Sequence, residues 1–159
     1  EELKKLYMLW MNSLPEDAAK EVKKLYKKRK AEGLDLWITK PRKAEWLAQN
    51  LDNPFRSWDG EENISPANAK KAAAIYRKTR AAMVKLVEEP GDGFMKAAED
   101  LVREYADGFN KMDRKRPFIY TVERDEICMA LDEILALIPD ESGVDKDKLI
   151  DLFDQLKEF

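Results

Sequence analysis

Few side chains in this sequence could carry out chemistry, because the chain has no histidine and a single cysteine, Cys128. Without histidine there can be no Ser-His-Asp triad, no Cys–His pair and no imidazole zinc site. One cysteine can form neither an intrachain disulfide nor a thiolate metal cluster, and it suits a reducing compartment. Any catalytic centre would therefore depend on carboxylates, lysine, arginine or tyrosine.

Carboxylates at helical spacing occur at Asp100, Glu104 and Asp107, where they could hold a magnesium ion only if a second helix supplied a matching pair. The nearest candidate pair, Glu88-Glu89, falls beside the turn at Pro90-Gly91, where it cannot face them from within a helix. We therefore expect ordinary surface ion pairs at these positions.

The acidic turn at 139–145 does not fit a calcium-binding EF-hand loop. Placing Gly143 at the sixth loop position puts Ile138 first and Leu149 twelfth, where carboxylates are required. The sequence therefore predicts no catalytic residue, no metal site and no cofactor.

Basic residues gather on predicted helix faces and in one link, and these positions could contact the phosphates of a nucleic acid. A second explanation is that they are solvated helix faces, since acidic residues are interspersed with them. The candidate nucleic-acid-binding residues are Lys20, Lys23, Lys24, Lys27, Lys28, Lys70, Arg77, Lys78, Arg114, Lys115 and Arg116.

Two other groups of residues could contact a protein partner. Phe55 and Trp58 lie in an aperiodic stretch, 52–63, where they either pin the loop to the core or form exposed anchors. Asp125, Met129 and Asp132 are predicted to share the outward side of a helix, so that a methionine lies among acids. Cys128 borders the apolar side of that helix and is expected to behave as a small hydrophobic side chain.

The composition suits a globular helical protein. Of 159 residues, 44% are hydrophobic and 38% charged, and no apolar run approaches the ~20 residues of a membrane-spanning helix. Residues 1–116 hold 25 Lys and Arg against 20 Asp and Glu, and residues 117–159 hold 4 against 12, so the net charges are +5 and −8. The acidic end could pack beside the basic remainder or meet a basic partner.

The strongest helix signal is at 64–91. Ser65 is a suitable N-cap, Pro66 suits the first helical position, and Pro90-Gly91 ends the run. A second periodic stretch follows at about 93–113, so the two are expected to form a central antiparallel hairpin.

The remaining pattern predicts five more helices and one apolar link. The helices are expected at 3–14, 16–32, 39–51 and 121–138, with a further one after Asp145. The link at 34–38 is expected to insert into the core. The sequence thus predicts an all-α compact bundle of six to seven helices in one domain, 1–159, with 117–159 as a possible appended acidic hairpin.

The function expected from these features is non-catalytic protein binding, as in an inhibitor, immunity protein, effector or adaptor. The partner would be a protein with a basic surface, and nucleic acid is the alternative. A carboxylate-dependent enzyme is the third possibility. The expected location is the cytoplasm or another reducing compartment, with delivery to a host cell as a further option, and the oligomeric state is left open.

Overall fold

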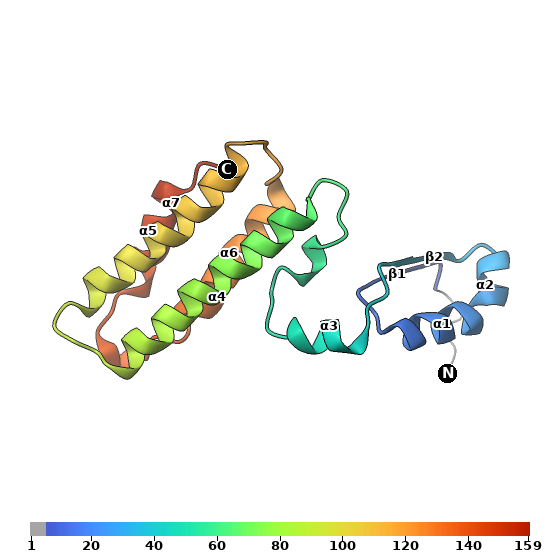
Figure 1. Ribbon diagram of the computed structural model, residues 1–159, viewed down its shortest axis with the longest axis horizontal. Coiled ribbons are helices and arrows are strands. Elements are labelled where there is room, and N and C mark those ends of the chain that lie inside the picture. The colour runs from blue at the N-terminus through green and yellow to red at the C-terminus, as the bar shows by residue number, and fades with distance from the viewer. Residues whose placement is uncertain (1–5) are drawn as a thin grey trace. The chain divides into compact units, whose positions relative to one another are not determined.

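The computed structural model describes residues 6–159 and shows a mostly helical protein (Figure 1). These residues contain seven α-helices, two short 3-10 helices and a two-stranded sheet, and about 62% of them are helical. The all-α prediction is therefore wrong in its detail, since the sheet was not expected. Backbone contacts divide the chain at Asp52 into two compact units, whereas the sequence predicted one domain.

The first unit is a β-α-β arrangement followed by one more helix. Its elements are β1 (Met8–Asn12), α1 (Glu16–Leu25), α2 (Lys27–Ala31), β2 (Asp35–Thr39) and α3 (Ala44–Gln49). The two strands are parallel and in register, so that Trp10 lies beside Trp37 and Asn12 beside Thr39.

The prediction of a helix at 3–14 is wrong for the residues that the structure describes, and its first three residues lie outside them. Leu9 and Met11 are half-buried, whereas Met8, Trp10 and Asn12 are exposed. This alternation has the two-residue period of a strand with one covered face. The link expected at 34–38 is likewise mainly strand β2, and its burial alternates in the same way from Asp35 to Ile38.

The outer face of this sheet is uncovered within the first unit. Trp10 is 67% exposed and Trp37 is 60% exposed, so neither tryptophan is buried, although the link at 34–38 that holds Trp37 was expected to insert into the core. In the described part of this unit the fully buried hydrophobic side chains are Ala19 and Leu34. A core of this size contributes little stability, because hydrophobic stabilisation scales with the apolar area removed from water.

The helix predicted for 16–32 is interrupted at Tyr26, between α1 and α2. Leu25, the last residue of α1, is 70% exposed. Glu16 and Asp17 lie in the first turn of α1 and Lys23 and Lys24 in its last turn, an arrangement that complements the helix dipole.

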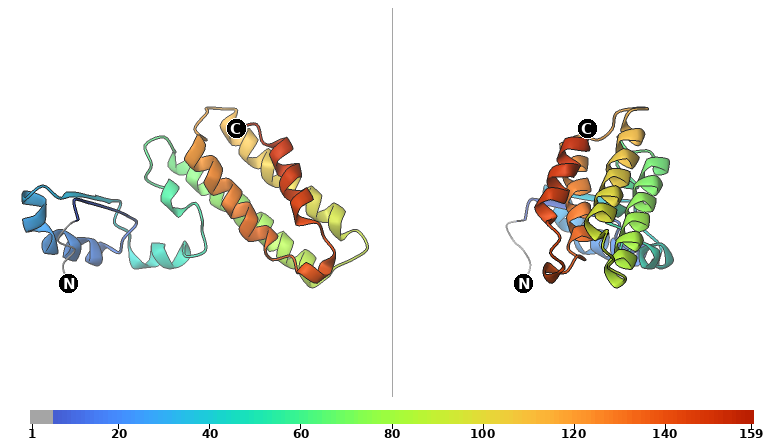
Figure 2. Two further views of the ribbon diagram at one scale, coloured as in Figure 1. Left: turned by 180° about the vertical axis from the view of Figure 1, so that it is seen from behind. Right: turned by 90° about the vertical axis from the view of Figure 1, so that its left-hand side faces the viewer.

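The second unit, 53–159, is a helical bundle with its own core (Figure 2). Its elements are η1 (Arg56–Trp58), α4 (Pro66–Glu88), α5 (Phe94–Asp113), α6 (Thr121–Leu135), η2 (Asp140–Ser142) and α7 (Lys146–Leu156). Helix α4 packs on α5 and α6, and α5 packs on α7. Helices α6 and α7 thus share the core of α4 and α5 and do not form an appended hairpin.

Helix starts in this unit follow the local sequence. Ser65 Oγ accepts a hydrogen bond from the Asn68 amide at 3.2 Å, and Pro66 occupies the first turn of α4. Asp145 caps α7 in the same way, through the Lys148 amide. These caps satisfy amides that have no partner within the helix.

The core of the bundle is aromatic where α5 passes between its neighbours. Tyr105 stacks at 5.0 Å from Phe109 and at 5.8 Å from Phe153 of α7. The Tyr105 hydroxyl donates to the Ile127 carbonyl of α6 at 3.0 Å. Ile127, Leu131, Ile134 and Ile138 recur at intervals of four, three and four residues and are all buried.

Candidate partner-binding surfaces

Phe55 and Trp58 are buried side chains of the second unit, each only 1% exposed. Their rings lie 4.7 Å apart, and Phe55 is 5.6 Å from Phe109 of α5. They therefore pin the loop at 52–63 to the core, the first of the two alternatives. The prediction that they form exposed anchors for a partner is therefore wrong, because buried rings leave no surface for a partner to contact.

Polar groups fasten the same loop to α6. Trp58 Nε1 donates to Glu126 at 2.5 Å, and Asn63 Nδ2 donates to Glu123 at 2.9 Å. Glu123 also accepts from the Tyr120 amide at the start of α6. Burial raises the pKa of Glu126, and this effect outweighs the opposing hydrogen bond from Trp58.

Asp125, Met129 and Asp132 are all exposed on α6, at intervals of four and three residues that place them on one side of the helix. Met129 is 65% exposed. Val122, one turn before Asp125, is 66% exposed on the same side. We call these four residues the α6 face. Val122 is a member that the sequence analysis missed, although its spacing of three residues from Asp125 was a usable signal.

The α6 face has an acidic border on α7. Partial burial raises the pKa of Asp132, and the nearby Asp154 of α7 raises it further. The pKa of Cys128 is also raised, first by burial. A thiol with a raised pKa is a poor nucleophile, in keeping with its expected role as a small hydrophobic side chain.

The candidate nucleic-acid-binding residues are divided between the two units. The five lysines at 20–28 lie on α1 and α2 of the first unit, and all are exposed. The other six lie on α4 and in the link after α5. Several pair with acids: Lys20 with Asp17, Lys28 with Glu32, Lys78 with Glu104, and Arg114 with Glu158.

The carboxylates of α5 form the surface ion pairs that their spacing suggested. Asp100 pairs with Lys96, Glu104 with Lys78, and Asp107 with Lys111. Within residues 6–159, no group of three or more His, Cys, Asp or Glu side chains lies close enough to hold a metal ion. No helix in this part of the chain is both long and apolar enough to cross a membrane.

Comparison of the chain with protein-family models, with curated proteins and with solved structures gives no match.

Proposed function

We propose that this protein is a non-catalytic protein-binding module of the inhibitor, immunity, effector or adaptor type, and that it docks a basic partner surface on the α6 face. Its scaffold is a helical bundle around a central antiparallel hairpin, α4–α5. The observation that carries the proposal is the exposure of two apolar side chains, Val122 before Asp125 and Met129 between Asp125 and Asp132, on one side of α6. Apolar anchors among charges combine hydrophobic contact with charge-directed specificity.

The opposite side of α6 packs into the core of the bundle, and a helix that is already packed favours binding because it needs little further ordering on association. Ile127 and Leu131 are buried beneath it. Tyr76 of α4 donates to Glu133 at 3.1 Å, so the helix is also held by a polar contact along its flank.

The test uses the tagged chain to capture a partner, which is then purified and titrated calorimetrically. Replacing both Asp125→Lys and Asp132→Lys should weaken binding at least tenfold, because two attractive charges become repulsive. Met129→Ala should weaken it through loss of an apolar anchor. A charge-matched control, Glu88→Lys with Glu89→Lys at the end of α4, should bind like the wild type. Equal loss in the control, or no loss in the α6 variants, would refute this surface.

Nucleic-acid binding is the alternative, and the exposure of all five lysines on α1 and α2 is the observation that favours it. The expected signature is retention on heparin and a gel shift that weakens with salt, since phosphate contacts release counterions. No retention on heparin at low salt would exclude nucleic-acid binding.

The free thiol of Cys128 favours the cytoplasm or another reducing compartment for either function.

A further inference from the structure

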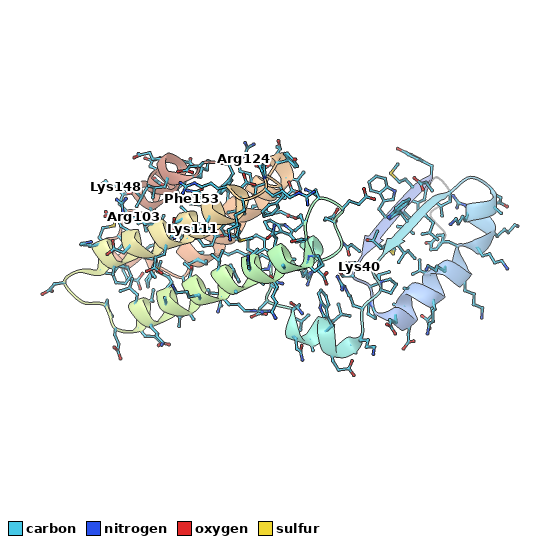
Figure 3. The ribbon with its side chains drawn as sticks, turned by 45° about the horizontal axis from the view of Figure 1, so that its top comes forward. Lys40, Arg103, Lys111, Arg124, Lys148 and Phe153 are labelled. Carbon is cyan, nitrogen blue, oxygen red and sulfur yellow. The ribbon has the colours of Figure 1, made fainter. Side chains whose placement is uncertain are left out.

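A groove between α4 and α5 combines an apolar floor with a basic rim. Its volume is about 630 Å³, within the range of small-molecule sites. The floor is formed by Ala74 and Ile75 of α4 and by Gly108 and Met112 of α5. The rim is formed by Lys71, Lys111, Arg114 and Lys115 (Figure 3 labels Lys111). We call this the α4–α5 groove.

Gly108 allows the floor to form. A Cβ atom at this position would lie 2.9 Å from Ile75 Cδ1, closer than real Cβ atoms approach, so alanine here would require the Ile75 side chain to shift. Glycine costs roughly 1 kcal/mol relative to alanine inside a helix, and the close approach of Ile75 is the contact that the missing Cβ allows.

The charges of the groove have a direction. Lys71 lies near the start of α4, and the other three cations lie at or just after the end of α5. All four therefore lie toward the end of the groove that contains Asn68. One turn beyond Ile75, Lys78 of α4 reaches Glu104 of α5 at 2.7 Å, and this ion pair crosses between the helices at the other end. The apolar floor therefore lies between the cationic end of the groove and the Lys78–Glu104 ion pair. The distance from Asn68 to Ile75 is about 10 Å along the helix, which is enough for an apolar ligand tail of medium length.

The cations at the rim are not all neutralised. Lys111 pairs with Asp107 and Arg114 with Glu158. Lys71 and Lys115 have no ion-pair partner among the described residues. A ligand whose anionic head reaches these two lysines would gain charge attraction that the folded chain leaves unused.

We propose that the α4–α5 groove binds a small amphiphile with one anionic head group and a medium-length apolar tail. The head lies against Lys71 and Lys115, and the tail lies over Ile75, Gly108 and Met112. This site is independent of the proposed function, which uses α6. The single cationic end distinguishes it from a surface for a long acidic helix, which would need cations along its whole length.

The test is calorimetric titration of the full chain with decanoate below its micellar concentration at low salt. Saturable binding is expected, with decanol and decyltrimethylammonium binding at least tenfold more weakly. Lys71→Glu with Lys115→Glu should weaken decanoate binding at least tenfold, because the head group would then face two negative charges. Ala74→Trp should weaken it comparably by filling the floor. Circular dichroism checks that each variant remains helical.

The matched control is Lys70→Glu with Arg116→Glu. These exposed residues are one position away from Lys71 and Lys115 and do not line the groove. The control should bind decanoate like the wild type. Equal loss in the control, equal binding of the cationic analogue, or no saturation by decanoate would overturn the proposal.

Two further probes distinguish the small amphiphile from other ligands of the groove. Binding only to phosphatidylglycerol vesicles, or only to an acidic peptide, with loss in Lys71→Glu/Lys115→Glu, would assign the groove to that ligand instead.

Discussion

Glu126 illustrates how a single side chain links the loop to the bundle. It is a partly buried carboxylate that accepts the indole N–H of the buried Trp58. Burial raises its pKa, Glu123 and Glu61 add to this, and the hydrogen bonds from Trp58 and Ser57 oppose it. The ionised form of Glu126 is therefore less favourable in the folded protein than in the unfolded chain.

We expect Glu126→Gln to stabilise the protein at neutral pH while keeping an acceptor for Trp58. In the wild type, the Glu126 carboxyl binds its proton more tightly in the folded state than in the unfolded state. Stability should fall as pH rises from the ordinary carboxyl pKa through the raised one. Urea unfolding should show the variant more stable at pH 7, with the difference vanishing below the ordinary pKa, where both states are protonated. An equal difference at both pH values would contradict this, and exposed Glu89→Gln is the comparison for loss of a surface charge.

At the scale of the element, the start of α4 tests whether a local signal contributes stability. Ser65→Ala removes the acceptor of the Asn68 amide and should destabilise the protein by about 1 kcal/mol. Ser65→Asp should restore most of that loss, because aspartate is also a good N-cap. Chemical denaturation measures both. If Ser65→Asp is as destabilised as Ser65→Ala, the cap does not explain the effect.

The packing of α4 on α5 gives a second prediction at this scale. Alanine at position 108 would favour the helix by roughly 1 kcal/mol but would press on Ile75. Ile75→Val removes the atom that lies 2.9 Å from the added Cβ. Gly108→Ala should therefore be more stabilising in the Ile75→Val background than in the wild type, by about 1 kcal/mol in a double-mutant cycle. Additive effects would show that the two residues do not compete for space.

At the scale of the whole molecule, the two units differ in how much core they contain. The connected hydrophobic core lies entirely within 53–159, whereas Ala19 and Leu34 are the fully buried hydrophobic residues among 6–52. A two-stranded parallel sheet with one bare face is also weak, since parallel sheets are normally covered on both faces.

We therefore expect the fragment 53–159 to fold by itself and the fragment 1–52 to lack a cooperative transition. Thermal unfolding followed by circular dichroism should be sigmoidal for 53–159 and gradual for 1–52. A sigmoidal transition for isolated 1–52 would show that its small core suffices. A gradual one for 53–159 would show that the bundle needs the rest of the chain.

The sequence by itself determined much of the second unit, because caps and a 3.6-residue period are local properties. Ser65 and Asp145 cap the helices that they were predicted to start. The apolar stripe of α5 is buried at Phe94, Tyr105 and Phe109 as the period predicted. The outward side of α6 was likewise readable from spacing alone.

Only the tertiary structure decided the features that depend on partners distant in the chain. Five-residue strands are too short for periodicity to separate them from helix, and β1 acquires its partner β2 some 27 positions later. Phe55 and Trp58 carry no period, so their burial follows from the aromatic rings that the helices place beside them, such as Tyr76 of α4 and Phe109 of α5. The α4–α5 groove arises in the same way, because Ile75 and Gly108 meet only when the chain has folded back on itself.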